Sequence, residues 1–194
     1  MKFKKKNNFL EKYFRDLSKV IIPDRNCLKK LEKVKNLIIA VSKRRGKVLI
    51  FGNGGSSAIA SHVTVDLTKN ARIRAVNFNE ADLITCFSND YGYERWIEKA
   101  IDFYADQKDI IILISSSGRS QNMIKACKFA NRKRLKVISF TGHTRNNPLS
   151  KISDISLWVN SKAYNFIENT HQIWLLGLCD LIIGKREYSA KRKD

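Results

Sequence analysis

Hydrophobic residues near the start of the chain recur every three or four positions, which is the spacing of an amphipathic helix. One such run covers residues 7–20 and a second covers residues 27–45. Pro23 lies between the runs and interrupts any continuous helix. Gly46 follows the second run, at a place where a C-terminal cap is favoured. The pattern therefore predicts two N-terminal helices.

The rest of the chain alternates between short apolar runs and segments of helical spacing such as residues 56–69. The apolar runs have the length and composition of buried strands. They are KVLIFG (47–52), IRAVNF (73–78), DIIILIS (109–115), LKVISFT (135–141) and DISLWV (154–159). Strands that alternate with helices form parallel βαβ units, so we expect an α/β fold.

A final helix is predicted from about Tyr164 to Ile183, and it is too apolar to be a one-faced surface helix. It lies either in the core or at a subunit interface. The length of 194 residues fits a single domain. We divide it into N-terminal helices (1–46), an α/β core (47–184) and a basic tail (185–194) that is expected to fray.

The chain is strongly basic, with a formal net charge of +19 and an isoelectric point near 10. This charge favours polyanions in general, including phosphorylated metabolites and nucleic acid. The basic residues are spread over the sequence and form no known nucleic-acid module. We therefore interpret them as a solvated basic surface and expect any nucleic-acid binding to be weak and nonspecific.

No apolar stretch reaches the roughly 18 residues that span a bilayer, and no apolar signal core follows the basic start of the chain. We expect a cytoplasmic protein that does not bind membranes. The cysteines show no C-x-x-C spacing and are expected to be buried free thiols; they are Cys27, Cys86, Cys127 and Cys179.

Two polar loops follow predicted strands and have chemistry suited to phosphate. FGNGGSSA (51–58) brings backbone N–H groups close to a ligand, and SSSGRS (115–120) adds hydroxyl donors at the start of the next helix. Neither loop is a P-loop or a complete dinucleotide-binding motif. Each loop alone is compatible with simple turn and capping chemistry, but two on successive βα units favour a binding site.

Four segments together resemble the sugar isomerase (SIS) domain family, and specifically its phosphoheptose isomerases and their DnaA-initiator-associating relatives. These segments are FGNGGSSAIASH (51–62), SNDYGYE (88–94), ISSSGRSQNMIKA (114–126) and HQIWLLGLCDLI (171–182). The resemblance covers nearly the whole chain. It implies a flavodoxin-like, doubly wound parallel sheet, a homotetramer, and a site shared between subunits.

The resemblance also implies which residues bind a sugar phosphate. The serine loop would hold the phosphate, the glycine loop would line the site, and a polar pair after residue 88 would contact the substrate. The implied substrate-binding residues are Asn53, Gly54, Gly55, Ser56, Asn89, Asp90, Ser115, Ser116, Ser117, Ser120 and Glu168.

The sequence departs from these relatives at the positions that perform chemistry. Phosphoheptose isomerases carry a histidine and a glutamate after the glycine loop, and a glutamine and a histidine on the last helix. The corresponding residues here are His62 and Asp66, then Glu168 and Leu176. The usual catalytic histidine is therefore absent. His171 lies one turn after Glu168, so Asp66, Glu168 and His171 are the candidate catalytic residues.

Zinc is the cofactor that the resemblance implies, because these positions ligate zinc in some members of the family. The candidate ligands are His62, Asp66 and Glu168. Structural alternatives remain for the same side chains: Asp66 as a solvated helix residue, His171 as a hydrogen-bonding partner at a packing seam, and Glu168 as a carboxylate favoured by the helix dipole.

Two functions follow from this comparison. The first is a phosphosugar isomerase that interconverts the aldose and ketose forms of a heptose phosphate similar to sedoheptulose 7-phosphate, for lipopolysaccharide or capsule precursors. The second is a non-catalytic SIS protein that binds a sugar phosphate or a partner such as the DnaA initiator. Loss of the usual histidine favours the second function, while the two phosphate loops and the two carboxylates favour the first.

Overall fold

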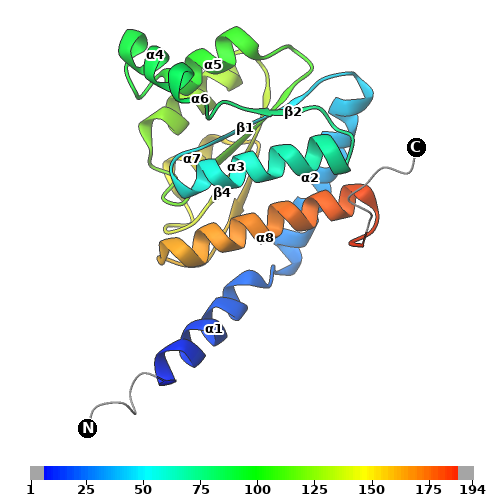
Figure 1. Cartoon of the computed structure of the whole chain (residues 1–194), viewed down its shortest axis with the longest axis vertical. Helices are drawn as coiled ribbons and strands as arrows, with labels where there is room; N and C mark the ends of the chain where they lie inside the picture. The colour runs from blue at the N-terminus through cyan, green and yellow to red at the C-terminus, as the bar shows by residue number, and fades with distance from the viewer. Residues whose placement is uncertain (1–6, 188–194) are drawn as a thin grey trace.

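The computed structural model describes residues 7–187, so most of the predicted basic tail lies outside the described residues. Two helices open the fold, α1 (Asn7–Ile21) and α2 (Arg25–Lys43). They separate around Pro23 as predicted, and the Asp24 carboxylate caps α2 by accepting a hydrogen bond from the Cys27 backbone N–H. Helix α1 projects from the body of the molecule (Figure 1).

Within the described residues, parallel strands form one sheet in the order β2-β1-β3-β4-β5. The strands are β1 (Val48–Gly52), β2 (Ala75–Asn77), β3 (Ile110–Ser115), β4 (Lys136–Thr141) and β5 (Ile155–Trp158). Each coincides with a predicted apolar run. The strand order is the flavodoxin-like one, which confirms the predicted fold class.

Helices cover both faces of this sheet (Figure 1). They are α3 (Gly55–Val65), α4 (Ala81–Tyr91), α5 (Trp96–Tyr104), α6 (Gln121–Arg132), α7 (Pro148–Ile152) and α8 (Tyr164–Ile183), with a π-helical turn η1 (Asp66–Asn70) after α3. Because strand side chains alternate between faces, β1 sends Ile50 toward α2, α3 and α8, and Leu49 toward α5, α6 and α7. Continuous apolar strands are expected where both faces are buried.

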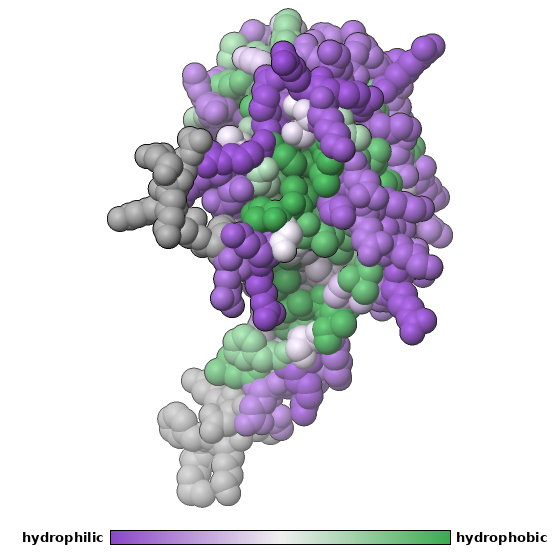
Figure 2. Space-filling view, turned by 90° about the vertical axis from the view of Figure 1, so that its right-hand side faces the viewer, coloured by the Kyte–Doolittle hydropathy of each residue, from purple (hydrophilic) through white to green (hydrophobic). Residues whose placement is uncertain are grey.

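Helix α8 is largely a core helix, as its sequence allowed. Ile167, Leu175 and Leu178 are buried against the sheet and the neighbouring helices. Helix α1 packs on α8 and leaves Phe9 and Phe14 more than half exposed. A band of apolar surface accordingly runs from the projecting helix onto the body (Figure 2). Among the described residues, no helix is long and apolar enough to cross a membrane.

Candidate functional site

The glycine and serine loops meet at the carboxyl ends of β1 and β3. Strand β1 pairs with β2 on one side and with β3 on the other. The strand order therefore reverses between β1 and β3. Ligands of open α/β sheets bind at such a switch point. A cavity of about 160 Å³ opens here, which we call the serine cavity. It is lined by Asn53, Ser56, Ile114, Ser115, Ser116, Ser117, Ser120, Tyr164 and Glu168.

Several hydroxyl groups in the serine cavity are available to a ligand. Within residues 7–187, the hydroxyls of Ser56, Ser115 and Ser120 make no hydrogen bond to another protein group. Ser120 occupies the N-cap position of α6, yet its side chain does not cap the helix. A serine hydroxyl can rotate to donate to an anionic oxygen. These three groups can therefore serve as ligand donors without breaking an existing contact.

The first turns of two helices also face this region. Helix α3 begins at Gly55 and α6 begins at Gln121, and neither has a side-chain cap. Their first N–H groups and the helix dipoles favour an anion. Gly118 lets the serine loop pack closely against the side chain of Asn147. Its φ is 62°, and a Cβ at this position would lie 2.0 Å from Asn147 Oδ1. The arrangement is suited to a phosphate group.

Glu168 brings a carboxylate to the same cavity from α8. Its Oε1 accepts a long hydrogen bond of 3.5 Å from Ser116 Oγ. Gly55 makes room for it, since a Cβ at that position would lie 2.3 Å from Glu168 Oε2. Glu168 therefore faces the glycine and serine loops, and its predicted role in binding or catalysis stays a prediction. A negative group beside an anion site is unfavourable for phosphate itself, but it can interact with hydroxyl or carbon-bound protons of an attached sugar.

A row of polar side chains continues from the cavity along the seam between α3 and α8. His62 Nδ1 lies 3.2 Å from Gln172 Nε2, and His62 Nε2 lies 3.9 Å from Asp66 Oδ2. Asp66 Oδ1 also accepts a hydrogen bond of 3.0 Å from Asn70. Asp66 follows Ser56 by ten residues, about 15 Å along a helix axis. Asp66 is therefore at the far end of this row from the serine cavity.

A family model described as the SIS domain matches residues 12–142, which is more than half of the chain. The chain belongs to the SIS domain family. A phosphoheptose isomerase of Helicobacter pylori (strain P12) is 31% identical over 158 residues, or 78% of this chain and 82% of the relative. A phosphoheptose isomerase of Syntrophotalea carbinolica is 30% identical over 182 residues, or 89% and 91% of the two chains.

Solved structures of similar proteins match this SIS domain over nearly its whole length. A phosphoheptose isomerase from Francisella tularensis has a TM-score of 0.85 at 28% identity, covering 93% of this chain and 99% of that chain. A phosphoheptose isomerase from Neisseria gonorrhoeae has a TM-score of 0.77 at 26% identity, covering 91% and 96%. Both matches extend over more of the chain than the α/β core alone.

His171 does not face the serine cavity of this SIS domain, so its prediction as a catalytic residue is wrong. The side chain is fully buried, packs edge-on against Phe140, and places Nε2 3.1 Å from the Thr141 carbonyl oxygen. Burial lowers the pKa of His171 to about 4, against a smaller opposing effect of this hydrogen bond. A neutral ring that donates from Nε2 inside the core cannot reach a substrate, and the packing-seam interpretation holds.

The predicted metal ligands do not form a metal centre within one chain. Among residues 7–187, no group of three or more His, Cys, Asp and Glu side chains is arranged to hold a metal ion. His62 and Asp66 pair with each other, whereas Glu168 faces the serine loop. The donor set of a single subunit therefore does not fit zinc, and we derive no chemical step through a metal.

Asn89 and Asp90 do not line the serine cavity in a single chain. Both are exposed near the end of α4, where Asn89 Nδ2 donates a hydrogen bond of 3.0 Å to Asp90 Oδ1. Their predicted contact with substrate stays a prediction that requires another subunit or a movement of α4. Sequence reasoning missed Tyr164, which lines the cavity. Its place one turn before Glu168 on α8 was the available signal.

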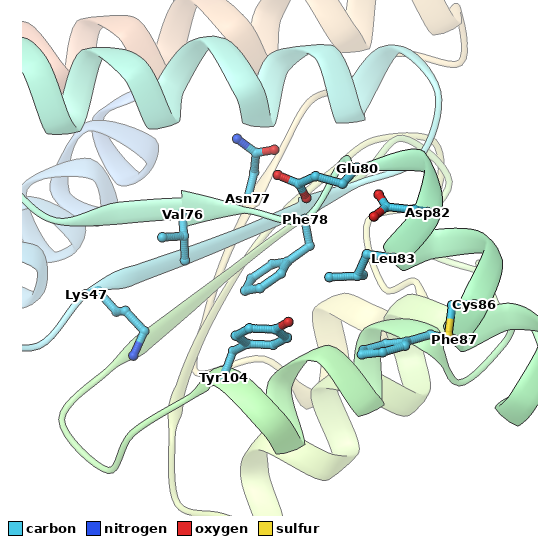
Figure 3. Close-up of a pocket in the computed structure, with 10 residues that line it drawn as sticks. All are labelled: Lys47, Val76, Asn77, Phe78, Glu80, Asp82, Leu83, Cys86, Phe87 and Tyr104. Carbon is cyan, nitrogen blue, oxygen red and sulfur yellow. The ribbon is translucent and has the colours of Figure 1, made fainter.

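A larger cavity of about 610 Å³ lies between β2, α4 and the end of α5 (Figure 3). It shares no residue with the serine cavity. Aromatic and aliphatic side chains form most of its wall, including Phe78, Leu83 and Tyr104. Cys86 lines it and is exposed, so the expectation of burial is wrong for this cysteine and confirmed for the other three. We assign the binding site to the smaller cavity, because serine hydroxyls and the N-termini of α3 and α6 converge there at the ends of β1 and β3.

Proposed function

We propose that this SIS domain is a phosphosugar isomerase that interconverts the ketose and aldose forms of a heptose phosphate similar to sedoheptulose 7-phosphate. The observation that carries the proposal is the serine cavity, in which free hydroxyls and two helix N-termini lie beside the carboxylate of Glu168. The similar Helicobacter and Francisella proteins are phosphoheptose isomerases, which supports the same reaction class.

The separation between the serine cavity and the His62–Asp66 pair supports an extended substrate. A phosphate held by the serine hydroxyls would leave the remainder of the sugar to run along the α3–α8 seam past Gln172. In a 7-phosphate the carbonyl carbon is near the opposite end of the carbon chain from the phosphorus. A long chain of this kind is therefore better suited to reach Asp66 than a short sugar phosphate.

Isomerisation needs only proton movements. A base removes the proton from the carbon beside the carbonyl, a carbon–carbon double bond forms, and the enediol takes a proton on the former carbonyl carbon. A second proton moves from one oxygen to the other, so atoms and charge balance without a co-reactant. We assign Asp66 as the base and Glu168 as a group that handles sugar hydroxyl protons. A placed general base contributes about 10²- to 10⁴-fold in rate.

One observation favours a second function, a sugar-phosphate-binding protein without turnover. Leu176 stands where the resemblance places a histidine, and its side chain packs against the buried cluster of α2, α3 and α8. His171 is buried and does not replace the missing group. If no other residue supplies the second proton transfer, binding would persist without isomerisation.

Exchange of solvent deuterium into the substrate separates the two functions. The protein would be incubated in D₂O with sedoheptulose 7-phosphate, with fructose 6-phosphate and with unphosphorylated sedoheptulose, with and without added zinc, and followed by NMR. We expect deuterium at the carbon beside the carbonyl of the heptose phosphate only. Binding without exchange for every phosphorylated sugar would reject the isomerase and support the binding protein. The role in surface-polysaccharide precursors follows only if the heptose phosphate is turned over.

A further inference from the structure

Two asparagine side chains join the glycine loop to the start of α6. Asn53 Nδ2 donates to Asn122 Oδ1 at 3.1 Å, and Asn122 Nδ2 donates to Asn53 Oδ1 at 2.9 Å. Asn122 is only 2% exposed, so its amide must find partners within the protein. Asn53 lines the serine cavity, whereas Asn122 lies behind it.

The orientation of both amides is fixed by a group that can only donate. The backbone N–H of Met123 donates to Asn122 Oδ1 at 2.9 Å, which sets the oxygen of Asn122 on that side. The amide nitrogen of Asn122 must then point toward Asn53 and find an oxygen there. Asn53 is consequently held with its oxygen toward Asn122 Nδ2 and its nitrogen toward Asn122 Oδ1.

Tyr93, from a separate part of the chain, also holds the Asn53 amide by a hydrogen bond. Its hydroxyl donates to Asn53 Oδ1 at 3.3 Å, although the side chain is 57% exposed. Tyr93 lies in the turn between α4 and α5, and the next residue, Glu94, forms an ion pair with Lys125 of α6. These two contacts hold the turn next to the glycine loop and α6.

The orientation of the Asn53 amide determines whether a donor or an acceptor faces a ligand in the serine cavity. Both hydrogen bonds at Asn53 Oδ1 occupy the oxygen, while Asn53 Nδ2 uses one of its two hydrogens and keeps the other. A flipped amide would present an oxygen to the ligand and repel a phosphate or an acceptor hydroxyl. The observed orientation presents a donor beside the free serine hydroxyls.

We propose that Tyr93 and Asn122 are positioning residues that hold the Asn53 amide so that its spare N–H donates to an oxygen of the bound sugar phosphate. The proposal rests on the proposed function for the nature of the ligand. Neither positioning residue needs to touch the substrate. Removing the Tyr93 hydroxyl would weaken the hold on the Asn53 amide, and removing the Asn122 amide would let it turn; either change would weaken binding while the fold remains.

The first test compares Tyr93→Phe with Tyr91→Phe. Both changes remove one hydroxyl from the same stretch of chain, but the Tyr91 hydroxyl makes no hydrogen bond in residues 7–187. Sedoheptulose 7-phosphate and inorganic phosphate serve as probes, with dissociation constants from calorimetry. We expect Tyr93→Phe to raise the constant for the sugar phosphate about three- to tenfold, the value of one neutral hydrogen bond. Tyr91→Phe should leave it unchanged.

Inorganic phosphate identifies the oxygen that Asn53 contacts. A parallel loss for both probes places the Asn53 N–H on the phosphate group, while a loss confined to the sugar phosphate places it on a sugar oxygen. Both results support the proposal. Equal constants for the wild type and Tyr93→Phe with both probes would overturn it.

An Asn53→Ala background tests whether Tyr93 acts through Asn53. If it does, Tyr93→Phe has no further effect in that background. A further loss of the original size would show direct contact with the substrate and reject the positioning role. Asn122→Ala removes the donor to Asn53 without adding a charge, so we expect at least the loss seen for Tyr93→Phe, with circular dichroism checking that the fold remains.

Kinetics give a readout that a purely structural role would not change. A donor that binds substrate and transition state equally raises KM and leaves kcat nearly unchanged. We expect this split for Tyr93→Phe. Failure of this inference is distinguishable from failure of the proposed function. If the wild type binds the sugar phosphate without turning it over, the isomerase proposal is rejected, but the dissociation constants still test the positioning roles of Tyr93 and Asn122.

Discussion

The carboxylate of Glu168, on α8, occupies the space that a side chain at Gly55 would need at the start of α3. An alanine Cβ at position 55 would be 2.3 Å from Glu168 Oε2, which is closer than any real contact. The carboxylate is the far end of a flexible side chain and can rotate away. Gly55→Ala is therefore expected to displace the carboxylate rather than to unfold the protein.

We predict that Gly55→Ala and Glu168→Gln reduce kcat for the sugar phosphate to a similar extent, about tenfold or more. Gly177→Ala is the matched control, because Gly177 lies on α8 with nothing within 4 Å of its added Cβ. That control should gain about 0.5–1 kcal/mol of stability from helix propensity and keep its activity. A fully active Gly55→Ala protein would remove Glu168 from the mechanism.

The serine hydroxyls should carry the preference for phosphorylated ligands. We expect sugar phosphates to raise the melting temperature of the wild type and unphosphorylated sugars to have little effect. Combining Ser115→Ala with Ser120→Ala should abolish the shift, because both hydroxyls are free and line the cavity. Ser57→Ala on α3 is the control, as Ser57 does not line it. A full shift in the double variant would locate the phosphate elsewhere.

Asp66→Asn separates chemistry from binding. The substitution keeps the shape of the side chain and its contact with Asn70, but it removes the base. We predict a loss of at least about a hundredfold in kcat, with the phosphate-dependent melting shift retained. Steady-state kinetics with and without zinc would measure the loss. Unchanged turnover would transfer the role of base to another residue on the α3–α8 seam.

Burial of His171 should make stability depend on pH. Its pKa is lowered to about 4 in the folded protein, from about 6.5 in an exposed chain, so the unfolded state binds more protons between these values. Stability is then fully present above pH 6.5 and falls as pH decreases toward 4, by up to about 3 kcal/mol. Urea titrations should show that His171→Gln loses this part of the slope; an unchanged slope would contradict it.

The exposed apolar face of α1 predicts assembly. More than half of each side chain is exposed for Phe9, Leu10 and Phe14. Monomeric proteins rarely leave such a continuous apolar band exposed to solvent (Figure 2). We expect light scattering to report a tetramer of the 22.4 kDa chain. Phe9→Asp combined with Phe14→Asp should give smaller species. A monomeric wild type at micromolar concentration would reject a site shared between subunits.

The strands and the two loops of this protein were predictable because they depend on local sequence. A strand buried on both faces is mostly apolar, so β1 and β3 are visible as runs of hydrophobic residues. A chain that turns sharply onto a helix N-terminus needs glycine and small hydroxyl residues, so the two loops were visible as well. The break at Pro23 is equally local.

The tertiary structure alone decided which polar side chains reach the cavity. Glu168 and His171 lie three residues apart on α8, and only the packing of α8 against β4 turns Glu168 outward and His171 into the core. The contacts of Asn53 with Tyr93 and Asn122 span 40 and 69 residues. No local pattern encodes such distances, because they arise when the sheet places separate strand ends side by side.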